Sequence, residues 1–150
     1  MKALIQRVSQ ASVSINEQVK TKINQGLLVL LGIEESDNHD DIDWLCKKIA
    51  QLRIFDDNQG IMNLSIQDIN GELLVISQFT LHARTKKGNR PSYIKAARPE
   101  IAIPLYEKFI KKMSDFIKEE IQTGEFGAMM HVSLTNDGPV TIIIDTKNKE

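Results

Sequence analysis

The chain has 150 residues, a mass of 17.0 kDa and a formal net charge of −1 at pH 7. Its 41% hydrophobic and 26% charged residues are typical of a soluble globular protein and exclude disordered and fibrous classes. The longest apolar run, residues 27–31, is too short to cross a bilayer, and the N-terminus has no signal-peptide core. We therefore expect one cytosolic domain over residues 1–150, with no membrane association.

The first part of the chain predicts three β-strands. Apolar and polar residues alternate over residues 3–15, and a turn at Asn16-Glu17-Gln18 leads into a second strand over residues 19–23. The continuous apolar run Leu27-Leu28-Val29-Leu30-Leu31 ends at Gly32 and indicates a central strand that is buried on both faces.

An amphipathic helix is expected next. Ser36 or Asp37 is the expected N-cap, because short polar side chains accept hydrogen bonds from the first free N–H groups of a helix. The helix dipole explains the nearby carboxylates of Asp40, Asp41 and Asp43 without a metal ion. The apolar stripe contains Ile42, Leu45, Cys46 and Ile49. We therefore expect the single cysteine to be a buried thiol with a structural role.

The rest of the chain predicts further strands and one long helix. These are a buried strand over residues 72–79, a helix over about 100–120, and strands over 129–134 and 140–144 joined by a turn at 135–139. Together the elements predict a single-domain α/β fold with a layered α/β/β architecture, in which mixed β-sheets are covered by two main helices.

Common catalytic and cofactor motifs are absent from the sequence. The histidines, His39, His82 and His131, are far apart, and none belongs to a pattern with metal-ligand spacing, so we expect no metal site. There is no G-x-S-x-G elbow, no Walker loop and no G-x-G-x-x-G after a strand. Kinase, P-loop and dinucleotide-binding functions are therefore excluded, and we expect no cofactor.

The segment Ser77-Gln78-Phe79-Thr80 is the first candidate site, because it ends a buried strand where backbone N–H groups become free. The N–H groups of Phe79 and Thr80 can stabilise an oxyanion, and Thr80 can act as a nucleophile or orient a water molecule. His82 lies on the same face as Thr80 if the chain is extended, which allows a Thr-His pair. In the alternative interpretation, Ser77 and Thr80 only close the strand through local hydrogen bonds.

The segment Asn136-Asp137-Gly138-Pro139 is the second candidate, and its residue types first indicate a turn. Gly138 permits close approach of the backbone, while Pro139 fixes its own φ angle and has no N–H donor. Because only about 5–6% of X-Pro bonds in folded proteins are cis, the residues by themselves favour a trans peptide bond here.

A basic stretch runs from Leu81 to Arg98 and contains no acidic residue. Its basic residues are Arg84, Lys86, Lys87, Arg90, Lys95 and Arg98. Such a stretch in a nearly neutral protein is typical of a face that binds a polyanion, and a solvated basic loop is an equally good interpretation of the charges alone.

Several short stretches, spread in order along the chain, carry a more specific signal. They are Gln6-Arg7-Val8, Ala11-Ser12-Val13, Arg53-Ile54-Phe55, Met62-Asn63-Leu64-Ser65, Ser77-Gln78-Phe79-Thr80-Leu81, Lys87-Gly88-Asn89-Arg90-Pro91-Ser92 and Asn136-Asp137-Gly138-Pro139-Val140-Thr141. In these stretches the chain resembles the D-aminoacyl-tRNA deacylases of the bacterial and eukaryotic type. The resemblance covers essentially the whole sequence.

The resemblance implies an editing hydrolase that cleaves the ester between a D-amino acid, or glycine mischarged on tRNA(Ala), and the 3′-terminal ribose of tRNA. It implies a homodimer without metal or cofactor. The Gly138-Pro139 bond would be cis and would enter the partner subunit's pocket, which Ser77 to Thr80 would form. Arg7 and Asn136 would support this loop. Whether Thr80 attacks, orients water or only binds substrate stays open, since the substrate's 2′-hydroxyl and a positioned water can also serve.

The resemblance also gives the basic stretch a partner. Lys86, Lys87 and Arg90 would contact phosphates at the acceptor end of tRNA, in a salt-sensitive manner that does not depend on sequence. Two other functions compete with the deacylase. One is a non-catalytic RNA-binding module, and the other is an unrelated esterase or peptidase that uses Thr80 with His82.

Overall fold

A six-stranded mixed sheet and two helices form most of the structure, a computed structural model that describes residues 1–150. In chain order the elements are β1 (Lys2–Ile15), β2 (Gln18–Ile23), β3 (Gly26–Gly32), α1 (His39–Gln51), β4 (Phe55–Asp56), β5 (Met62–Leu64), β6 (Glu72–Ser77), the 3-10 turn η1 (Phe79–His82), α2 (Pro99–Met113), β7 (Gln122–Thr123) and β8 (His131–Asp145). The strand order is β2-β1-β3-β6-β7, and β8 pairs with the free side of β1. None of the helices is long and apolar enough to cross a membrane.

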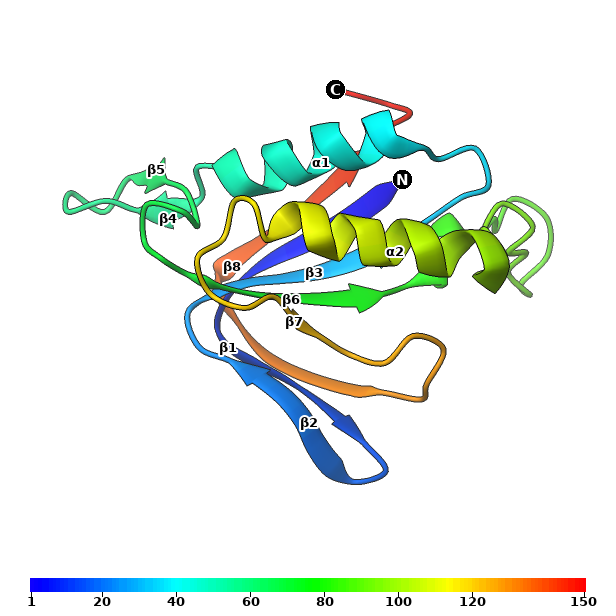
Figure 1. Ribbon diagram of the computed structural model, residues 1–150, viewed down its shortest axis with the longest axis horizontal. Helices are drawn as coiled ribbons and strands as arrows, with labels where there is room; N and C mark the ends of the chain where they lie inside the picture. Colours follow the sequence, from blue (N-terminus) through cyan, green and yellow to red (C-terminus); the bar gives the residue numbers. More distant parts are fainter.

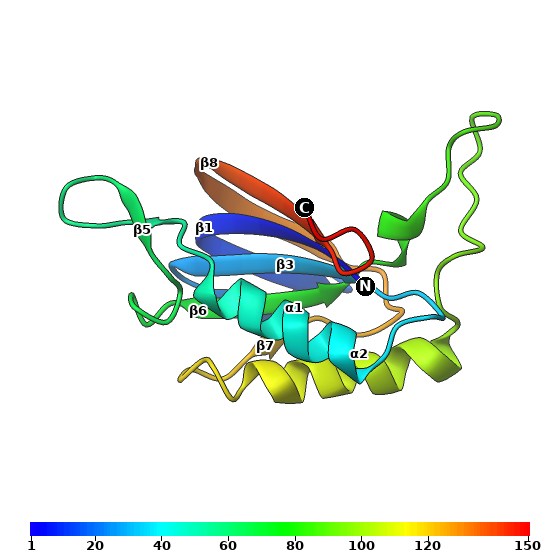
Figure 2. The same ribbon diagram turned by 90° about the horizontal axis from the view of Figure 1, so that it is seen from above.

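The elements form three layers. Helices α1 and α2 lie side by side on one face of the sheet (Figures 1 and 2). On the other face, the second half of β1 bends away together with β2, and its apolar side chains form a smaller core against β3 and β6. Strands β3 and β6 are parallel, whereas β1 is antiparallel to β2, β3 and β8. The predicted layered α/β/β class is therefore confirmed.

Strand β3 shows why its sequence is a continuous apolar run. It lies between β1 and β6 in the sheet. Leu27, Val29 and Leu31 belong to the large core beneath the helices, whereas Leu28 belongs to the small core on the opposite face. Each buried leucine stabilises the fold by roughly 2 kcal/mol through removal of its side chain from water. The prediction of a central strand buried on both faces is confirmed.

The N-cap of helix α1 lies one residue after Asp37 and two after Ser36, the two predicted caps. Asn38 is the N-cap, and its side chain accepts hydrogen bonds from the N–H groups of Asp40 and Asp41. The Asp41 carboxylate in turn accepts from the Asn38 N–H at 3.0 Å, which completes a capping box. The prediction of Ser36 or Asp37 was wrong because the Asp37 carboxylate accepts from the Glu34 N–H at 2.9 Å and so stabilises the turn before the helix.

Two further predicted elements have different boundaries. Helix α2 ends at Met113 rather than near residue 120, because the next N–H groups, of Asp115 and Phe116, donate to carbonyls three residues back, as in a turn. The predicted strand at 140–144 and residues 131–134 of the predicted strand at 129–134 are parts of the single strand β8, which begins at His131. Both parts pair with the long strand β1, and residues 137–140 loop out as a bulge that does not reverse the chain.

Cys46 lies in the large core with no exposed surface, and its thiol faces the Phe109 carbonyl of α2 at 3.7 Å. Burial raises the pKa of its thiol to about 12, so almost no thiolate forms near neutral pH. We expect no alkylation of the folded protein by iodoacetamide at pH 8 over one hour, and full alkylation in denaturant, measured by intact mass. Rapid modification of the folded chain would contradict this burial.

Candidate active site

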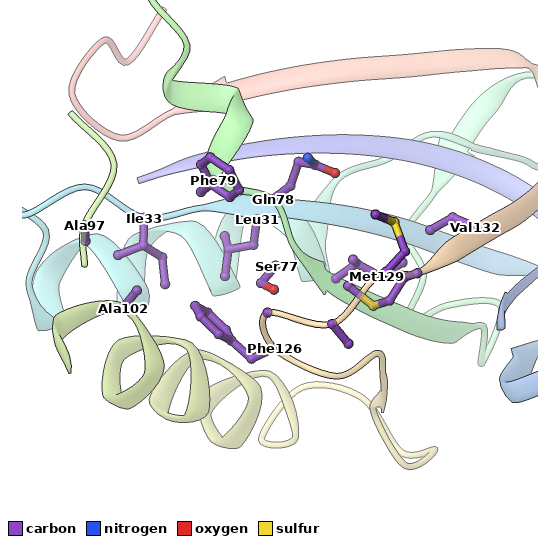
Figure 3. A pocket seen from close by; sticks show the side chains of 14 residues that line it. Leu31, Ile33, Ser77, Gln78, Phe79, Ala97, Ala102, Phe126, Met129 and Val132 are labelled. Carbon is purple, nitrogen blue, oxygen red and sulfur yellow. The ribbon is translucent and has the colours of Figure 1, made fainter. Parts of the chain in front are cut away.

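An apolar pocket of about 280 Å³ opens at the C-terminal ends of β3 and β6 (Figure 3). Its lining comes from segments that are far apart in the sequence. The lining residues are Leu31, Ile33, Ile76, Ser77, Gln78, Phe79, Ala97, Ala102, Phe126, Gly127, Ala128, Met129, Met130 and Val132. Three residues of the first candidate segment therefore lie at one concave and mostly hydrophobic site, as expected for a small-molecule pocket.

The backbone at Gln78 changes from strand to helical turn. The Gln78 N–H donates to the Leu31 carbonyl at 2.8 Å, which extends the β3–β6 pairing by one residue. Phe79 and Thr80 are the first two residues of the turn η1. The first N–H groups of a helical turn have no acceptor within that turn. The predicted strand is thus two residues too long, but its end leaves backbone donors beside the pocket as expected.

Thr80 lies just outside the pocket lining. Its hydroxyl oxygen accepts a hydrogen bond from the side-chain amide of Gln78. This contact is local, as in the alternative interpretation of the segment, and it links the orientation of Thr80 to a residue that lines the pocket. The structure therefore joins Ser77, Gln78 and Phe79 directly in the site and adds Thr80 through Gln78.

His82 does not pair with Thr80. Because η1 has about three residues per turn, residues two apart point in different directions, and the expectation that they share a face was wrong. The His82 side chain is buried, and its Nδ1 atom lies 3.7 Å from a carboxylate oxygen of Glu34. The geometry thus gives Thr80 no histidine base.

Residues 126–132 form one wall of the pocket, and sequence reasoning missed them. Strand β7 pairs in parallel with β6, so the chain that follows β7 reaches the end of β6 where Ser77 lies. Glycines at 124 and 127 mark a loop in the sequence, but no local signal indicates which strand end that loop approaches.

Tyr106 supports this wall from the core. Its hydroxyl donates to the Val75 carbonyl at 2.9 Å, and its ring makes an edge contact with Phe126 at 5.8 Å between centroids. Burial raises the pKa of Tyr106 to about 12, so the phenol stays protonated and keeps its donor. The pocket wall and strand β6 are therefore held by the same buried side chain.

Two aromatic rings lie at the rim of the pocket. Phe79 is 55% exposed and Tyr93 is 39% exposed, and their rings meet edge to face with centroids 5.1 Å apart. Exposed aromatic surface of this kind is suited to stacking against a flat ligand group. The sequence gives no local signal for the pairing of Phe79 with Tyr93.

The second candidate segment lies in the bulge of β8. Gln6 pairs with Thr141 and Val8 with Asn136, so residues 137–140 loop out opposite Arg7. The Gly138-Pro139 peptide bond is cis, and Gly138 has a φ angle of +133°. Both residues are exposed.

Arg7 and Asn136 both contact this bulge. The Arg7 side chain is only 8% exposed and donates to the carbonyls of Asp137 at 2.9 Å and Ile54 at 2.7 Å. The Asn136 side chain accepts from the Val140 N–H at 3.0 Å. It also donates to the Thr141 hydroxyl at 2.8 Å, so the base of the bulge is closed on both sides.

The two candidate segments do not meet within one chain. Gly138 lies beside Arg7, which pairs with Leu27 at the start of β3, whereas the pocket begins at Leu31. Leu27 and Leu31 are four steps apart along the strand, a distance of about 13 Å. Neither Gly138 nor Pro139 lines the pocket.

The basic residues Lys86, Lys87 and Arg90 lie in an exposed finger that projects from the body of the molecule (Figure 2). Paired backbone hydrogen bonds between Arg84 and Ser92, of 2.8 and 3.0 Å, close its neck. None of the three side chains forms an ion pair with an acidic residue of the chain.

No group of three or more His, Cys, Asp or Glu side chains is arranged to hold a metal ion.

Comparison with known proteins identifies the family. The family model described as D-Tyr-tRNA(Tyr) deacylase matches residues 4–145. The chain belongs to this deacylase family. It is 66% identical to a D-aminoacyl-tRNA deacylase of Bacteroides thetaiotaomicron and 64% identical to one of Flavobacterium psychrophilum, and each match covers 100% of both chains.

Solved structures give the same fold for this family member. A structure described as c-Myc DNA Unwinding Element Binding Protein has a TM-score of 0.93 and 38% identity, covering 97% of this chain and 99% of that one. A probable eukaryotic D-amino acid tRNA deacylase has a TM-score of 0.80 over 95% of this chain and 97% of that one. At 15% identity, the second likeness concerns the fold alone.

Proposed function

We propose that this chain is an editing enzyme that hydrolyses the ester between a D-amino acid and the 3′-terminal ribose of tRNA. As a member of the deacylase family, it is a D-aminoacyl-tRNA deacylase, an ester hydrolase. The observation that carries the proposed editing reaction is the pocket at the end of β6. There, free backbone donors of η1 adjoin a site without a strong protein base.

The reaction needs little from the side chains. Water attacks the ester carbonyl carbon, and the N–H groups of Phe79 and Thr80 stabilise the oxyanion that forms. The bond to the 3′-oxygen then breaks, one proton of the water passes to that oxygen, and the products are the free D-amino acid and tRNA. Thr80, oriented by Gln78, positions water or substrate, and the neighbouring 2′-hydroxyl of the ribose assists.

Chiral selection is assigned to the partner subunit of a homodimer. The Gly138-Pro139 bulge is exposed, is supported by Arg7 and lies too far from its own pocket, so its site of action is the pocket of a second copy. There its main-chain carbonyl groups receive the substrate's ammonium group, and its rigid backbone excludes an L side chain. Glycine, which has no side chain, passes the same filter, so glycyl-tRNA(Ala) is also a substrate.

Paired D- and L-tyrosyl-tRNA test the proposed selection. We expect hydrolysis of the D ester at least a hundredfold faster than that of the L ester, because a steric clash and an unpaired ammonium group each oppose the L form. Release of radiolabelled tyrosine measures both rates. Equal hydrolysis of the two esters, or tRNA binding without any hydrolysis, would favour the esterase or the RNA-binding module respectively.

Replacement of Thr80 and His82 separates the deacylase from a Thr-His hydrolase. We expect Thr80→Val to lower kcat for D-tyrosyl-tRNA by about tenfold to a hundredfold, since it removes a positioning hydroxyl. His82→Gln is expected to leave kcat within about threefold, because the imidazole does not reach Thr80. Loss of all activity in both variants, with unchanged thermal stability, would instead identify a Thr-His pair.

A further inference from the structure

A second pocket, of about 190 Å³, lies close to the candidate active site and is lined mostly by charged side chains. Its lining residues are Lys2, Glu34, His82, Ala83, Arg84, Lys95, Asp145 and Lys147. They come from the start of β1, the end of β8 and the chain just after it, the chain after β3, η1 and the two sides of the basic finger. Only Ala83 is apolar, so this pocket is suited to a polar ligand.

The charges of this polar pocket leave an excess of positive charge. Glu34 lies 3.7 Å from His82, and Asp145 lies 3.7 Å from Lys2, so each carboxylate has a basic neighbour. Lys147 pairs with Asp41 at 2.8 Å and with Asp37 at 3.4 Å. Arg84 and Lys95 have no acidic partner in the chain.

Two cations without partners at a concave site attract an anion. The guanidinium of Arg84 can bind a phosphate through two parallel hydrogen bonds, and the ammonium of Lys95 can neutralise it as a point charge. Arg84 is held in place by its backbone pairing with Ser92, which keeps the base of the finger at the pocket. The backbone that carries Arg84 is therefore fixed beside the pocket.

His82 forms a buried part of the pocket wall. It lines the pocket, its side chain is 1% exposed, and its Nε2 atom is buried without a hydrogen-bond partner. Buried polar atoms in native proteins nearly always have a partner, either protein, water or ligand. The His82 ring is closed off from solvent, so the exposed side chains of Arg84 and Lys95 are the groups that a ligand can reach.

The two pockets lie at opposite ends of the same short turn. Gln78 and Phe79 line the apolar pocket, and His82 lines the polar pocket. The turn η1 that joins them rises only about 6 Å from Phe79 to His82, at roughly 2 Å per residue. One substrate molecule can therefore occupy both pockets.

We propose that the polar pocket binds the phosphate on the 5′ side of the terminal nucleoside of the tRNA substrate, with Arg84 and Lys95 as its main ligands. The proposal rests on the proposed function, because the apolar pocket must hold the aminoacylated end. It distinguishes two roles within the basic stretch. The finger residues Lys86, Lys87 and Arg90 contact the remaining acceptor strand, whereas Arg84 and Lys95 bind one phosphate next to the reaction.

Titration with adenosine and with adenosine 5′-monophosphate tests the site without requiring hydrolysis. We expect the monophosphate to bind about tenfold more tightly, the effect of one charged hydrogen-bonded group, as followed by amide shifts in NMR spectra. The shifts at Ala83, Arg84 and Lys95 should occur with the monophosphate and not with adenosine. In Arg84→Ala/Lys95→Ala the two ligands should bind equally, while Lys111→Ala, which changes an exposed lysine of α2, should keep the tenfold difference.

Inorganic phosphate and D-tyrosyl-tRNA complete the test. Phosphate alone should shift the same amides in the wild type and not in the double variant. The double variant should raise KM for D-tyrosyl-tRNA by about tenfold with little change in kcat, since it removes ground-state binding. Equal binding of adenosine and its monophosphate by the wild type, or a full difference retained by the double variant, overturns the phosphate site. If the wild type hydrolysed D- and L-tyrosyl-tRNA equally, the proposed function would be overturned instead. That conclusion would hold whatever the relative affinities for adenosine and its monophosphate.

Discussion

Replacing Gly138 with alanine is expected to lower the rate of D-tyrosyl-tRNA hydrolysis by at least about a hundredfold. A Cβ atom at this position would lie 2.8 Å from a methyl group of Val140 and 3.0 Å from the Arg7 guanidinium. The φ angle of +133° is also one that residues with a side chain rarely adopt. The bulge must therefore shift, and a displacement of about 1 Å in a positioning element can cost a hundredfold in rate.

Gly60→Ala provides the matched control for this substitution. Gly60 also has a positive φ angle, +75°, but a Cβ atom there has no neighbour within 4 Å. We expect about 1 kcal/mol of destabilisation from backbone strain and unchanged hydrolysis, measured by urea unfolding and by single-turnover assays. Wild-type activity of Gly138→Ala would show that the bulge does not act on the substrate.

Replacing Gly26 with alanine is expected to destabilise the fold by about 4 kcal/mol or more. A Cβ atom at Gly26 would lie only 1.8 Å from the Glu72 carbonyl oxygen and 2.8 Å from the Glu72 nitrogen. These are backbone atoms of the paired strand β6, so no side-chain rotation can relieve the overlap. Losses of this size are exceptional for single substitutions and amount to a large share of typical stability.

Urea unfolding followed by circular dichroism measures this loss. The expected result is a large fall in the midpoint with little change in the slope, because the same surface is exposed on unfolding. Gly60→Ala again serves as the control, since it adds the same methyl group in open space. A loss below about 1 kcal/mol would mean that β3 and β6 can separate without disturbing the rest of the sheet.

The two substitutions act on different parts of the same enzyme. Gly26 and Glu72 set the register of the parallel pair that ends at Leu31 and Ser77, and so they position the pocket. Gly138 shapes the bulge that we assign to selection in a partner subunit. A stability defect at Gly26 and an activity defect at Gly138 would therefore separate the assembly of the site from its chiral filter.

Several features followed from the sequence because they depend on local patterns. The apolar run of β3 predicted a strand buried on both faces, and helical spacing placed Cys46 in the core. The end of the buried strand at Ser77 also located the pocket, although the strand is two residues shorter than predicted. Hydrophobic periodicity carries this information because burial is decided by which face of an element each residue occupies.

Other features were decided only by contacts between distant segments. Strand β8 is continuous because β1 is long enough to pair with both of its parts, and the sequence of β8 alone indicated a turn. The pocket wall at Phe126 reaches Ser77 only because β7 joins the edge of β6. His82 turns away from Thr80 because the chain enters η1 after Gln78.

The sequence by itself determined the layered class of the fold and identified the segment at the end of β6 as a candidate site. Through its resemblance, it also indicated the deacylase family. The tertiary structure decided which residues complete the pocket and that Arg7 and Asn136 hold the Gly138-Pro139 bulge. It also decided that the bulge and the pocket of one chain lie apart. The physical reason is that pairing between distant strands depends on the register of the whole sheet, which local residue patterns do not specify.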